Sequence, residues 1–424
     1  MWDFNLPKEL NFTSICFNFQ NMERIKVVWL CVTPISPINH ILKLKKVPKI
    51  LAPWITVLIN ELKKRDEIEL HIISSGPSWK KSYRFVYEGV HYNFIRRFTP
   101  SFMKPFREEI RLDIFLNSLH LKRVVKRLVE KINPDIINLH GTEHEICTAF
   151  PQLNGNKILT IQGFINLVYQ ETPSPVNFWL LKTENKLLAT TEEFIVQANF
   201  MLGIIKKYNP AAKFTFCQYP SFRPHILAND FVPDTDIIYA SRICKDKGIE
   251  DLLNALVNVK KVLPKIKMKI IGKVSKEYEF YIKNLISTLG ISGNINFIGF
   301  VQSYDELYQH IAKSKIFVLP THHDVIPSSV IESMFIGTPV ISNCVGGLPD
   351  LNLEKQTCIL VKKGDVNSLA KCIEDLLDDN QMQKQLIVNA KEMVSYNFDE
   401  VRIGDRLIEI YRNKIAQKLI DKRE

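Results

Sequence analysis

The segment KIFVLPTHHDVIPSSVIESMFIGTPVISNCVGG (Lys315–Gly347) brings two acidic side chains to the end of an apolar strand. Lys315–Thr321 has the composition of a buried strand. Asp324 and Glu332 follow it eight positions apart, with no obvious basic partner beside either one. Beyond them the pattern predicts a helix, a Gly-Thr-Pro turn, a second strand and a glycine pair. Parallel sheets bind ligands at the carboxyl ends of their strands, so the two acids are candidate ligand-binding groups. The alternative is a loop aspartate and an ordinary helix glutamate.

The composition indicates a soluble globular protein of two or three domains, with 424 residues, 46% of them hydrophobic and 24% charged. The eight cysteines are scattered without a Cys-x-x-Cys pair. This favours a reducing compartment and argues against a disulfide framework or a zinc site. No run of about 18 apolar residues predicts a spanning helix, and the first ten residues do not resemble a secretory signal. The sequence therefore predicts a cytoplasmic protein.

The positive charge is confined to the first half of the chain. Residues 1–225 hold 30 Lys and Arg against 19 Asp and Glu, whereas residues 226–424 hold 26 of each kind, so the whole net charge of +11 lies in the first half. Three clusters carry much of it: Lys43, Lys45, Lys46 and Lys49; Arg96, Arg97, Lys104, Arg107 and Arg111; and Lys122, Arg123, Lys126 and Arg127. Interleaved apolar residues favour peripheral contact with an anionic membrane surface. No nucleic-acid motif accompanies the charge, and a solvated basic face is the alternative for any one cluster.

Strand and helix patterns alternate along the chain. In the first half, strands are predicted at 24–33, 68–75, 135–141, 157–163 and within 192–200, with helices at 52–65 and 116–132. In the second half, strands are predicted at 235–242, 266–273, 295–301 and 315–321, with a helix at 248–264. Two such sets predict an α/β protein with two parallel-sheet, Rossmann-like domains. Prolines place the break near residues 218–232.

Two cations follow the first strand of the second half. Arg242 comes just after that strand, and Lys247 comes just before a helix that begins at Gly248. Cations beside a helix N-terminus, at the carboxyl edge of a sheet, form a cradle for a diphosphate; a solvated basic loop is the alternative. Gly272 and Gly299 end two further strands and permit close backbone approach to a ligand.

This ordered set resembles the large family of retaining glycosyltransferases with the GT-B fold, known as group 1 or family four. The features are Arg242 and Lys247 after one strand, then glycine-ended strands, then Asp324 and Glu332. The resemblance is strong from about Asp236 to Asp350 and weaker before, and it is to the surface-polysaccharide subgroup.

The family resemblance implies two domains facing a central cleft. Residues 1–220 would bind the acceptor, residues 221–395 would bind the nucleotide sugar, and C-terminal helices at 396–424 would cross back to the first domain.

The resemblance also implies roles on the donor side of the cleft. Arg242 and Lys247 would hold the diphosphate, and Glu332 would accept hydrogen bonds from the ribose. Asp324 stands where the family usually has glutamate and would face the transferred sugar. The other donor-site residues implied are Ser328, Ser329 and Val330 near the phosphates and ribose, the strand-end Gly272 and Gly299, and the glycine pair Gly346 and Gly347.

On the acceptor side, His140 ends the strand in NPDIINLHG and would lie in the cleft near the reacting carbon, with His144 in the same loop. Gln162, followed by Gly163, stands where relatives commonly have histidine, and glutamine does not titrate near neutrality. A second departure is the loop with Ser36 and Asn39, where relatives often have a Gly-Gly loop against the donor phosphates, so the resemblance implies that both residues lie in the cleft.

The implied reaction is a retaining transfer of a sugar from a nucleotide-diphosphate sugar to a hydroxyl of a glycan or lipid-linked acceptor, in surface-polysaccharide synthesis. Asp324, Arg242, Lys247 and His140 are the expected catalytic residues. No cofactor and no essential metal are expected, because Arg and Lys take the cation's role. The letters Asp-x-Asp at 234–236 precede a strand and are interpreted as a linker turn.

Two alternatives from other classes stay open. A GT-B-like subunit that binds a glycan or a partner without transferring sugar is compatible with Gln162 and Ser36. A sugar-nucleotide epimerase or dinucleotide oxidoreductase is the other, although no Gly-x-Gly-x-x-Gly follows any predicted strand.

Overall fold

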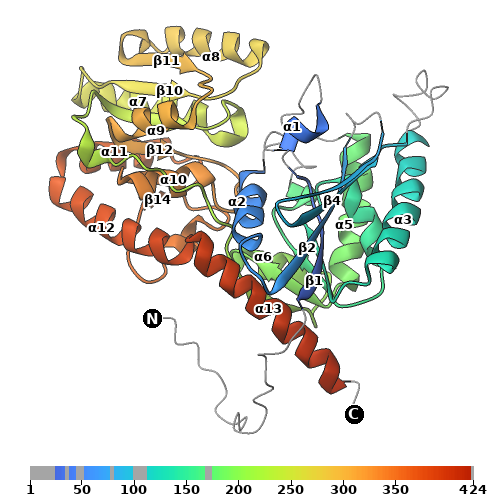
Figure 1. Cartoon of the computed structure of the whole chain (residues 1–424). Coiled ribbons are helices and arrows are strands. Elements are labelled where there is room, and N and C mark those ends of the chain that lie inside the picture. The colour runs from blue at the N-terminus through green and yellow to red at the C-terminus, as the bar shows by residue number, and fades with distance from the viewer. Residues whose placement is uncertain are drawn as a thin grey trace, which may run out of the picture.

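The chain forms two α/β units joined side by side (Figure 1). The computed structural model describes residues 24–33, 38–43, 52–76, 81–98, 112–167 and 174–421. Six lysines and arginines of the first two basic clusters lie outside the described residues: Lys45, Lys46, Lys49, Lys104, Arg107 and Arg111.

The first unit is built on a sheet of eight described strands in the order β3-β4-β2-β1-β5-β6-β7-β8. The strands are β1 (Ile25–Leu30), β2 (Ile68–Gly76), β3 (Tyr83–Tyr87), β4 (Val90–Arg96), β5 (Ile136–His140), β6 (Lys157–Thr160), β7 (Glu193–Val196) and β8 (Lys213–Phe216). Neighbouring strands are parallel except in the edge hairpin β3–β4. Glu88 and Gly89 both have positive φ in that hairpin's turn, as a two-residue turn with the right twist requires.

Helices cover both faces of this sheet and enclose two apolar cores. One core lies under α2 (Pro53–Leu62) and α13 (Glu400–Asp421), and the short α1 (Asn39–Leu42) packs at its border. The other core lies under α3 (Leu112–Ile132), η4 (Glu145–Gln152), α5 (Pro175–Thr190) and α6 (Asn199–Lys206).

The second unit has a six-stranded, wholly parallel sheet in the order β11-β10-β9-β12-β13-β14. The strands are β9 (Thr235–Ala240), β10 (Met268–Ile271), β11 (Ile295–Gly299), β12 (Ser314–Leu319), β13 (Val340–Asn343) and β14 (Ile359–Val361). The helices are α7 (Ile249–Val262), α8 (Lys276–Thr288), α9 (Tyr304–Ala312), α10 (Ser328–Ile336), α11 (Val366–Asp378) and α12 (Asn380–Asn397).

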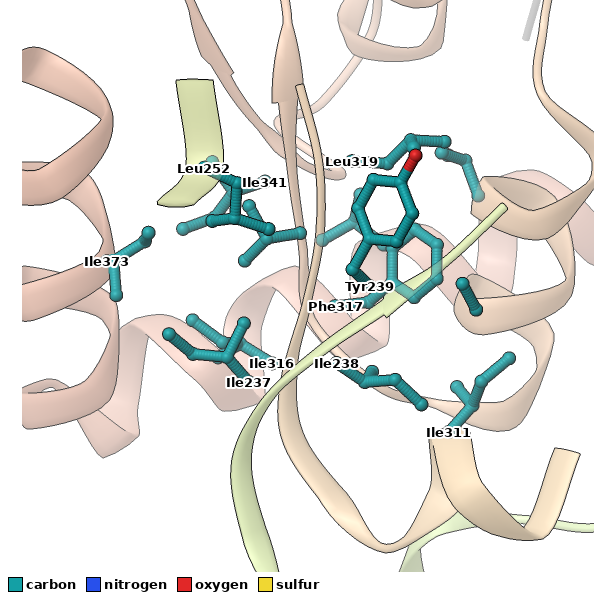
Figure 2. Close-up of a cluster of buried hydrophobic side chains, with 14 of the residues drawn as sticks. Ile237, Ile238, Tyr239, Leu252, Ile311, Ile316, Phe317, Leu319, Ile341 and Ile373 are labelled. Atoms are coloured by element: carbon teal, nitrogen blue, oxygen red, sulfur yellow. The ribbon is translucent and has the colours of Figure 1, made fainter. Parts of the chain in front are cut away.

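The central strands of the second sheet are apolar because helices bury both of their faces. Figure 2 shows Leu252 of α7 and Ile373 of α11 on one side of the strands, and Ile311 of α9 on the other. The two parallel-sheet domains that the sequence predicts are confirmed.

The last helix, α13, leaves the second unit and crosses to the first (Figure 1). Its Tyr411 is fully buried, and the Tyr411 hydroxyl receives hydrogen bonds from Trp29 Nε1 at 2.9 Å and Asn138 Nδ2 at 2.8 Å. Lys414 pairs with Glu193 at 2.6 Å. Because these partners lie on strands β1, β5 and β7, α13 is anchored across much of the first sheet.

Among the residues that the structure describes, no helix is both long and apolar enough to cross a bilayer.

Candidate functional site

The loops after β9 and β12 touch at a glycine. Gly248 begins α7 with φ of 70°, and a Cβ built on it would lie 1.8 Å from the backbone oxygen of Pro320, which directly follows β12. No side chain fits there, so glycine lets the two strand ends approach. This approach places Lys247 beside the loop that carries Asp324.

Lys247 and Asp324 form an ion pair, with Nζ 2.5 Å from Oδ2. The Thr321 hydroxyl donates to the same carboxylate oxygen at 2.8 Å. The two side chains are 10% and 19% exposed, so the pair lies at the border between interior and cleft. The expectation that Asp324 has no basic partner is therefore wrong. Its partner is distant in sequence and is brought near by the β9–β12 strand pairing.

Arg242 extends from the same edge of the sheet and is two-thirds exposed. Its described ion pair, with Asp246, is long at 3.8 Å. A guanidinium held this loosely keeps its donors available for an anion, and its planar fork suits phosphate oxygens.

The glycine pair Gly346 and Gly347 packs against the backbone of the Asp324 loop. A Cβ on Gly346, which has φ of 57°, would lie 1.6 Å from the backbone oxygen of Asp324. The Gly347 N–H donates to the Val325 oxygen at 2.7 Å. The pair therefore fixes the loop backbone, and in the structure these glycines contact the loop carrying the acid.

Gly272 and Gly299 also contact protein at close range. Gly272 lies so near Ser241 that a Cβ would come within 1.6 Å of the Ser241 oxygen, and the Gly272 N–H donates to the Gly299 oxygen at 2.8 Å. Around Gly299, with φ of 79°, a Cβ would meet nothing within 4 Å. Of the two strand ends, only Gly299 leaves open space beside its backbone.

Glu332 lies on α10 and is only 5% exposed. Burial raises the pKa of its carboxyl to about 7, while interaction with the Ser221 side chain acts in the opposite direction. Tyr304 and Tyr308 lie near enough that the Glu332 charge adds to the effect of burial in raising the pKa of both phenols. In this conformation Glu332 faces the domain linker and two phenols.

The three residues of the first turn of α10 differ in exposure. Ser328 lines a cavity that is described below, and Ser329 is half-buried. The Val330 side chain is fully buried, and its N–H already donates to the Pro327 oxygen at 3.0 Å. In this conformation the Val330 N–H is therefore already bonded within the chain. The N–H groups of Ser328 and Ser329 precede the first intrahelical bonds and point along the positive end of the helix.

Across the cleft, His140 ends β5 and is buried. Its Nδ1 lies 3.2 Å from the Tyr219 hydroxyl, and its ring lies 4.4 Å from the Trp29 ring. Burial lowers the pKa of His140 to about 3, so the imidazole is neutral at ordinary pH. Its Nε2 is buried and has no hydrogen-bond partner among the described residues.

The loops after β5 and β6 meet around a buried carboxyl. Glu143 lies against Gly141 and Gly163, where a Cβ would come within 2.9 Å of its carboxylate oxygens. Burial raises the pKa of Glu143 to about 7, and the negative charge of Glu184 adds to that effect. Burial lowers the pKa of His144 to about 4. The buried His140 and the enclosed carboxyl of Glu143 therefore both titrate away from their ordinary ranges on this side.

The remaining predicted cleft residues are Gln162, Asn39 and Ser36. Gln162 lines the cavity described next. Asn39 begins the short helix α1, and Ser36 lies outside the described residues.

A cavity of about 210 Å³ lies between the two units. Its lining combines the Asp324 loop, the start of α10, the domain linker and the strand ends of the first unit: Trp54, Gln162, Gln197, Gln218, Tyr219, Pro220, Ser221, Asp324, Val325, Ile326, Pro327, Ser328, Ile331 and Phe398. Trp54 Nε1, Gln197 Oε1 and Gln218 Oε1 are buried without a partner among the residues described. Buried polar atoms are nearly always hydrogen-bonded in folded proteins. These three therefore form a polar lining suited to a hydroxylated ligand.

Comparison with known proteins agrees with this architecture. Residues 229–393 match the family model described as "Glycosyl transferases group 1". The second unit is a group 1 glycosyltransferase domain. The matched region begins just before β9 and contains Arg242, Lys247, Asp324 and Glu332.

The chain is similar to an uncharacterized glycosyltransferase of Methanocaldococcus jannaschii, with 25% identity over 85% of this chain and 96% of that protein. It is also similar to the capsular polysaccharide biosynthesis glycosyltransferase CapM of Staphylococcus aureus, with 29% identity over 46% of this chain. The alignment spans about half of the length of CapM, and of another uncharacterized glycosyltransferase of M. jannaschii.

Solved structures show the same fold over nearly the whole chain. The sucrose-phosphate synthase of Thermosynechococcus elongatus aligns with a TM-score of 0.68 and 18% identity, over 93% of this chain and all of that one. HepE of Anabaena, in complex with UDP and glucose, aligns with a TM-score of 0.61 and 15% identity, over 91% and 99%. The predicted GT-B fold is confirmed.

The cleft contains residues that the sequence did not single out. Gln197 directly follows β7, and Gln162 comes two residues after β6, so a search for polar residues within two positions of each strand's end finds both. Trp54 lies on α2 and Tyr219 in the domain linker, and no sequence pattern marks either residue.

Proposed function

We propose that this glycosyltransferase moves a sugar from a nucleotide-diphosphate sugar to a hydroxyl of a glycan or lipid-linked acceptor, with retention of anomeric configuration, in surface-polysaccharide synthesis. The observation that carries the proposal is the interdomain cavity. The Asp324 loop and the start of α10 line one side of it, and next to that loop lie the lysine paired with Asp324 and a loosely held arginine. The other side has neutral amides whose side-chain oxygens are buried without a partner among the described residues.

The charged side suits a departing diphosphate. When the sugar–oxygen bond breaks, its electron pair stays on the diphosphate, and negative charge grows there. Arg242 and Lys247 oppose that charge, and they do so more strongly in the transition state than in the ground state. Before the donor arrives, Asp324 partly neutralises Lys247 at 2.5 Å. A bound diphosphate shares that lysine, which leaves Asp324 facing the sugar with one oxygen also held by Thr321.

The neutral side suits the attacking hydroxyl. In a retaining transfer without a protein nucleophile, the acceptor oxygen bonds to the sugar carbon on the face that the diphosphate leaves. The acceptor's proton passes to the departing phosphate oxygen. The side chains of Gln162 and Gln197 orient hydroxyls without taking the proton, and the buried His140 stays neutral beside them. No metal has a role in this scheme.

The descriptions of similar proteins support the substrate classes. HepE of Anabaena is described in complex with UDP and with UDP-glucose. CapM is described as acting in capsular polysaccharide biosynthesis, and a similar protein of Rhizobium meliloti in lipopolysaccharide core biosynthesis. For this chain, the donor's base and sugar and the acceptor's identity are open to the experiment below.

A metal-free thermal-shift screen against UDP, GDP, ADP and their sugar conjugates tests the donor site. A ligand at 100 times its dissociation constant should add about 2.7 kcal/mol to the free energy of unfolding. We expect one nucleotide to raise the melting temperature of the native chain and to leave that of Arg242→Ala unchanged. Lys261→Ala removes an exposed cation of the same unit and is the matched control, which should respond as the native chain does.

Transfer is then measured with the selected donor and candidate acceptors, with the product's anomeric configuration read by NMR. A nucleotide shift without transfer to any acceptor, or conversion of the donor alone, would count against the proposal. An inverted product would overturn retention while leaving the transferase in place.

We further propose that an anionic membrane surface is a partner of the first unit. Phe115 and Leu119 near the start of α3 are 53% and 45% exposed, and Phe98, whose ring contacts His120 of that helix, is 47% exposed. Further along the same helix, Arg123, Lys126 and Arg127 are also exposed. Exposed aromatic and aliphatic groups beside cations suit the boundary between headgroups and acyl chains. Of the first basic cluster, Lys45, Lys46 and Lys49 lie outside the described residues.

Sedimentation with vesicles of neutral and anionic lipid tests this contact. We expect binding to anionic vesicles only, and its loss in Arg123→Glu/Lys126→Glu/Arg127→Glu. The control Lys261→Glu/Lys384→Glu changes exposed lysines of the second unit and should bind normally. If the α3 variant binds anionic vesicles as well as the control does, α3 is excluded as the contact surface.

A further inference from the structure

A cluster of metal-ligand side chains lies on the first sheet at residues that the transfer scheme does not use. His71 of β2 and His91 of β4 are register partners on neighbouring parallel strands, so they project to the same face. Glu69 is two residues before His71 and shares that face. One ligand atom from each of the three lies within 4.8 Å of the other two.

We propose that Glu69, His71 and His91 form a site for one divalent transition-metal ion, zinc in the first instance. Two imidazoles and one carboxylate are a ligand set that zinc takes when a fourth position remains for water. His71 Nε2 and Glu69 Oε1 are already 2.6 Å apart, which is the spacing of two atoms that share a proton and that an ion can replace.

The third ligand has room to join them. The His71 and His91 rings are stacked, with centroids 4.3 Å apart and planes 18° apart, so their in-plane lone pairs do not yet converge. His91 is only half-buried, and the terminal torsion of a histidine ring is soft. Val86, the register partner of His91 on the edge strand, is 59% exposed, so this face of the sheet is open to solvent. A rotation of His91 completes the three-ligand set and leaves the outer position to water.

One cation lies beside the site. Lys26, the register neighbour of Glu69 on β1, is the cation that weakens the site.

The position separates this site from the cleft. Glu69 and His71 lie in the first half of β2, whereas the cleft gathers the carboxyl ends of the strands. The ion would tie β2 to β4 beside the edge hairpin and stabilise the first unit, with no part in sugar transfer. The scattered cysteines gave no sign of it, because its ligands are histidines and a glutamate.

Calorimetric titration of the EDTA-treated full chain with Zn²⁺ tests the proposal, with Co²⁺ absorption as a readout of geometry. We expect one ion per chain, a tetrahedral cobalt spectrum and a raised melting temperature. Loss of an outer-shell partner alone weakens metal sites by about 10- to 100-fold, so His91→Ala and Glu69→Gln should each weaken binding at least that much. Glu69→Gln keeps the shape of the side chain, which guards against a variant that merely misfolds.

Two further variants sharpen the result. Lys26→Met removes the opposing charge and should tighten binding several-fold. His225→Ala removes an exposed histidine of the linker and should bind as the native chain does. Absence of binding in the native chain, or binding that survives both His91→Ala and Glu69→Gln, would overturn the proposal.

Discussion

The two sides of the interdomain cavity differ in how they meet a ligand. On the side of the second unit, Asp324 lines the cavity and binds Lys247, and the exposed Arg242 extends from the same edge of the sheet. On the side of the first unit, Gln162 and Gln197 line the cavity without charge, and burial keeps the strand-end His140 uncharged. UDP-, GDP- and ADP-sugars all carry a diphosphate, whereas acceptors vary. On the proposed function, the charged side would therefore provide strength of binding and the neutral side would provide selectivity.

The largest expected effect comes from the charged side. Arg242→Ala and Lys247→Ala each remove a donor aimed at growing negative charge, and each should lower kcat/KM for transfer by about 10²- to 10³-fold. Steady-state kinetics with saturating acceptor measures this. A loss below tenfold in both variants would contradict the assignment of the diphosphate to this side.

The pH response of stability compares a buried carboxyl from each side. Glu332 and Glu143 both have a folded pKa raised to about 7 by burial. The folded state therefore favours their protonated forms. That stability is fully present below the unfolded pKa of about 4.5 and is lost as pH rises through about 7.

Glu332→Gln removes the ionisable group, so the variant does not lose stability through Glu332 as the pH rises. Its free energy of unfolding relative to that of the native chain should therefore increase between about pH 4.5 and 7, by roughly 3 kcal/mol in total. Urea unfolding at several pH values measures the difference. His140 and His144, whose lowered pKa values make stability fall as pH decreases, are present in both chains and cancel. A difference that does not change with pH would mean that Glu332 is ionised in the folded protein.

A smaller effect is expected from the neutral side. Gln197→Ala removes one amide from the cavity, and the loss of one uncharged hydrogen bond costs about 1 kcal/mol. The acceptor KM should rise by about five- to tenfold while the donor KM stays unchanged. A rise in the donor KM instead would move the donor sugar to this side of the cavity.

The smallest effect is expected from Tyr219→Phe. The change leaves His140 Nδ1 without its 3.2 Å partner and should lower the free energy of unfolding by about 1 kcal/mol. Thermal unfolding measures it. A double-mutant cycle with His140→Phe checks the cause. If the double variant loses as much unfolding free energy as the two single variants together, the two side chains are not coupled.

The sequence predicted the charged side better than the neutral one, for a physical reason. Arg242, Lys247, Asp324 and Glu332 belong to short strand-to-helix segments whose spacing is local. The partnership of Lys247 with Asp324 was missed because it depends on β9 lying next to β12.

Long-range proximity also explains the other omissions. Trp54 and Tyr219 reach the cavity from a helix and from the linker, which only the packed fold brings together. The hairpin β3–β4 has alternating residues around Glu88-Gly89, a signal that the strand-helix pattern obscured. The roles of the predicted site residues stay predictions until a donor is bound.

The crossing of α13 has a mechanical consequence. The chain passes between the two units twice, once through the linker near Tyr219 and once near Phe398, where α12 ends and α13 begins. Both Tyr219 and Phe398 lie on the cavity. Two connections between the units define an axis, which is the line that joins them. The units are therefore constrained to rotate about a line that passes beside the ligand, so opening and closing act on the cavity with little sliding of one side along the other.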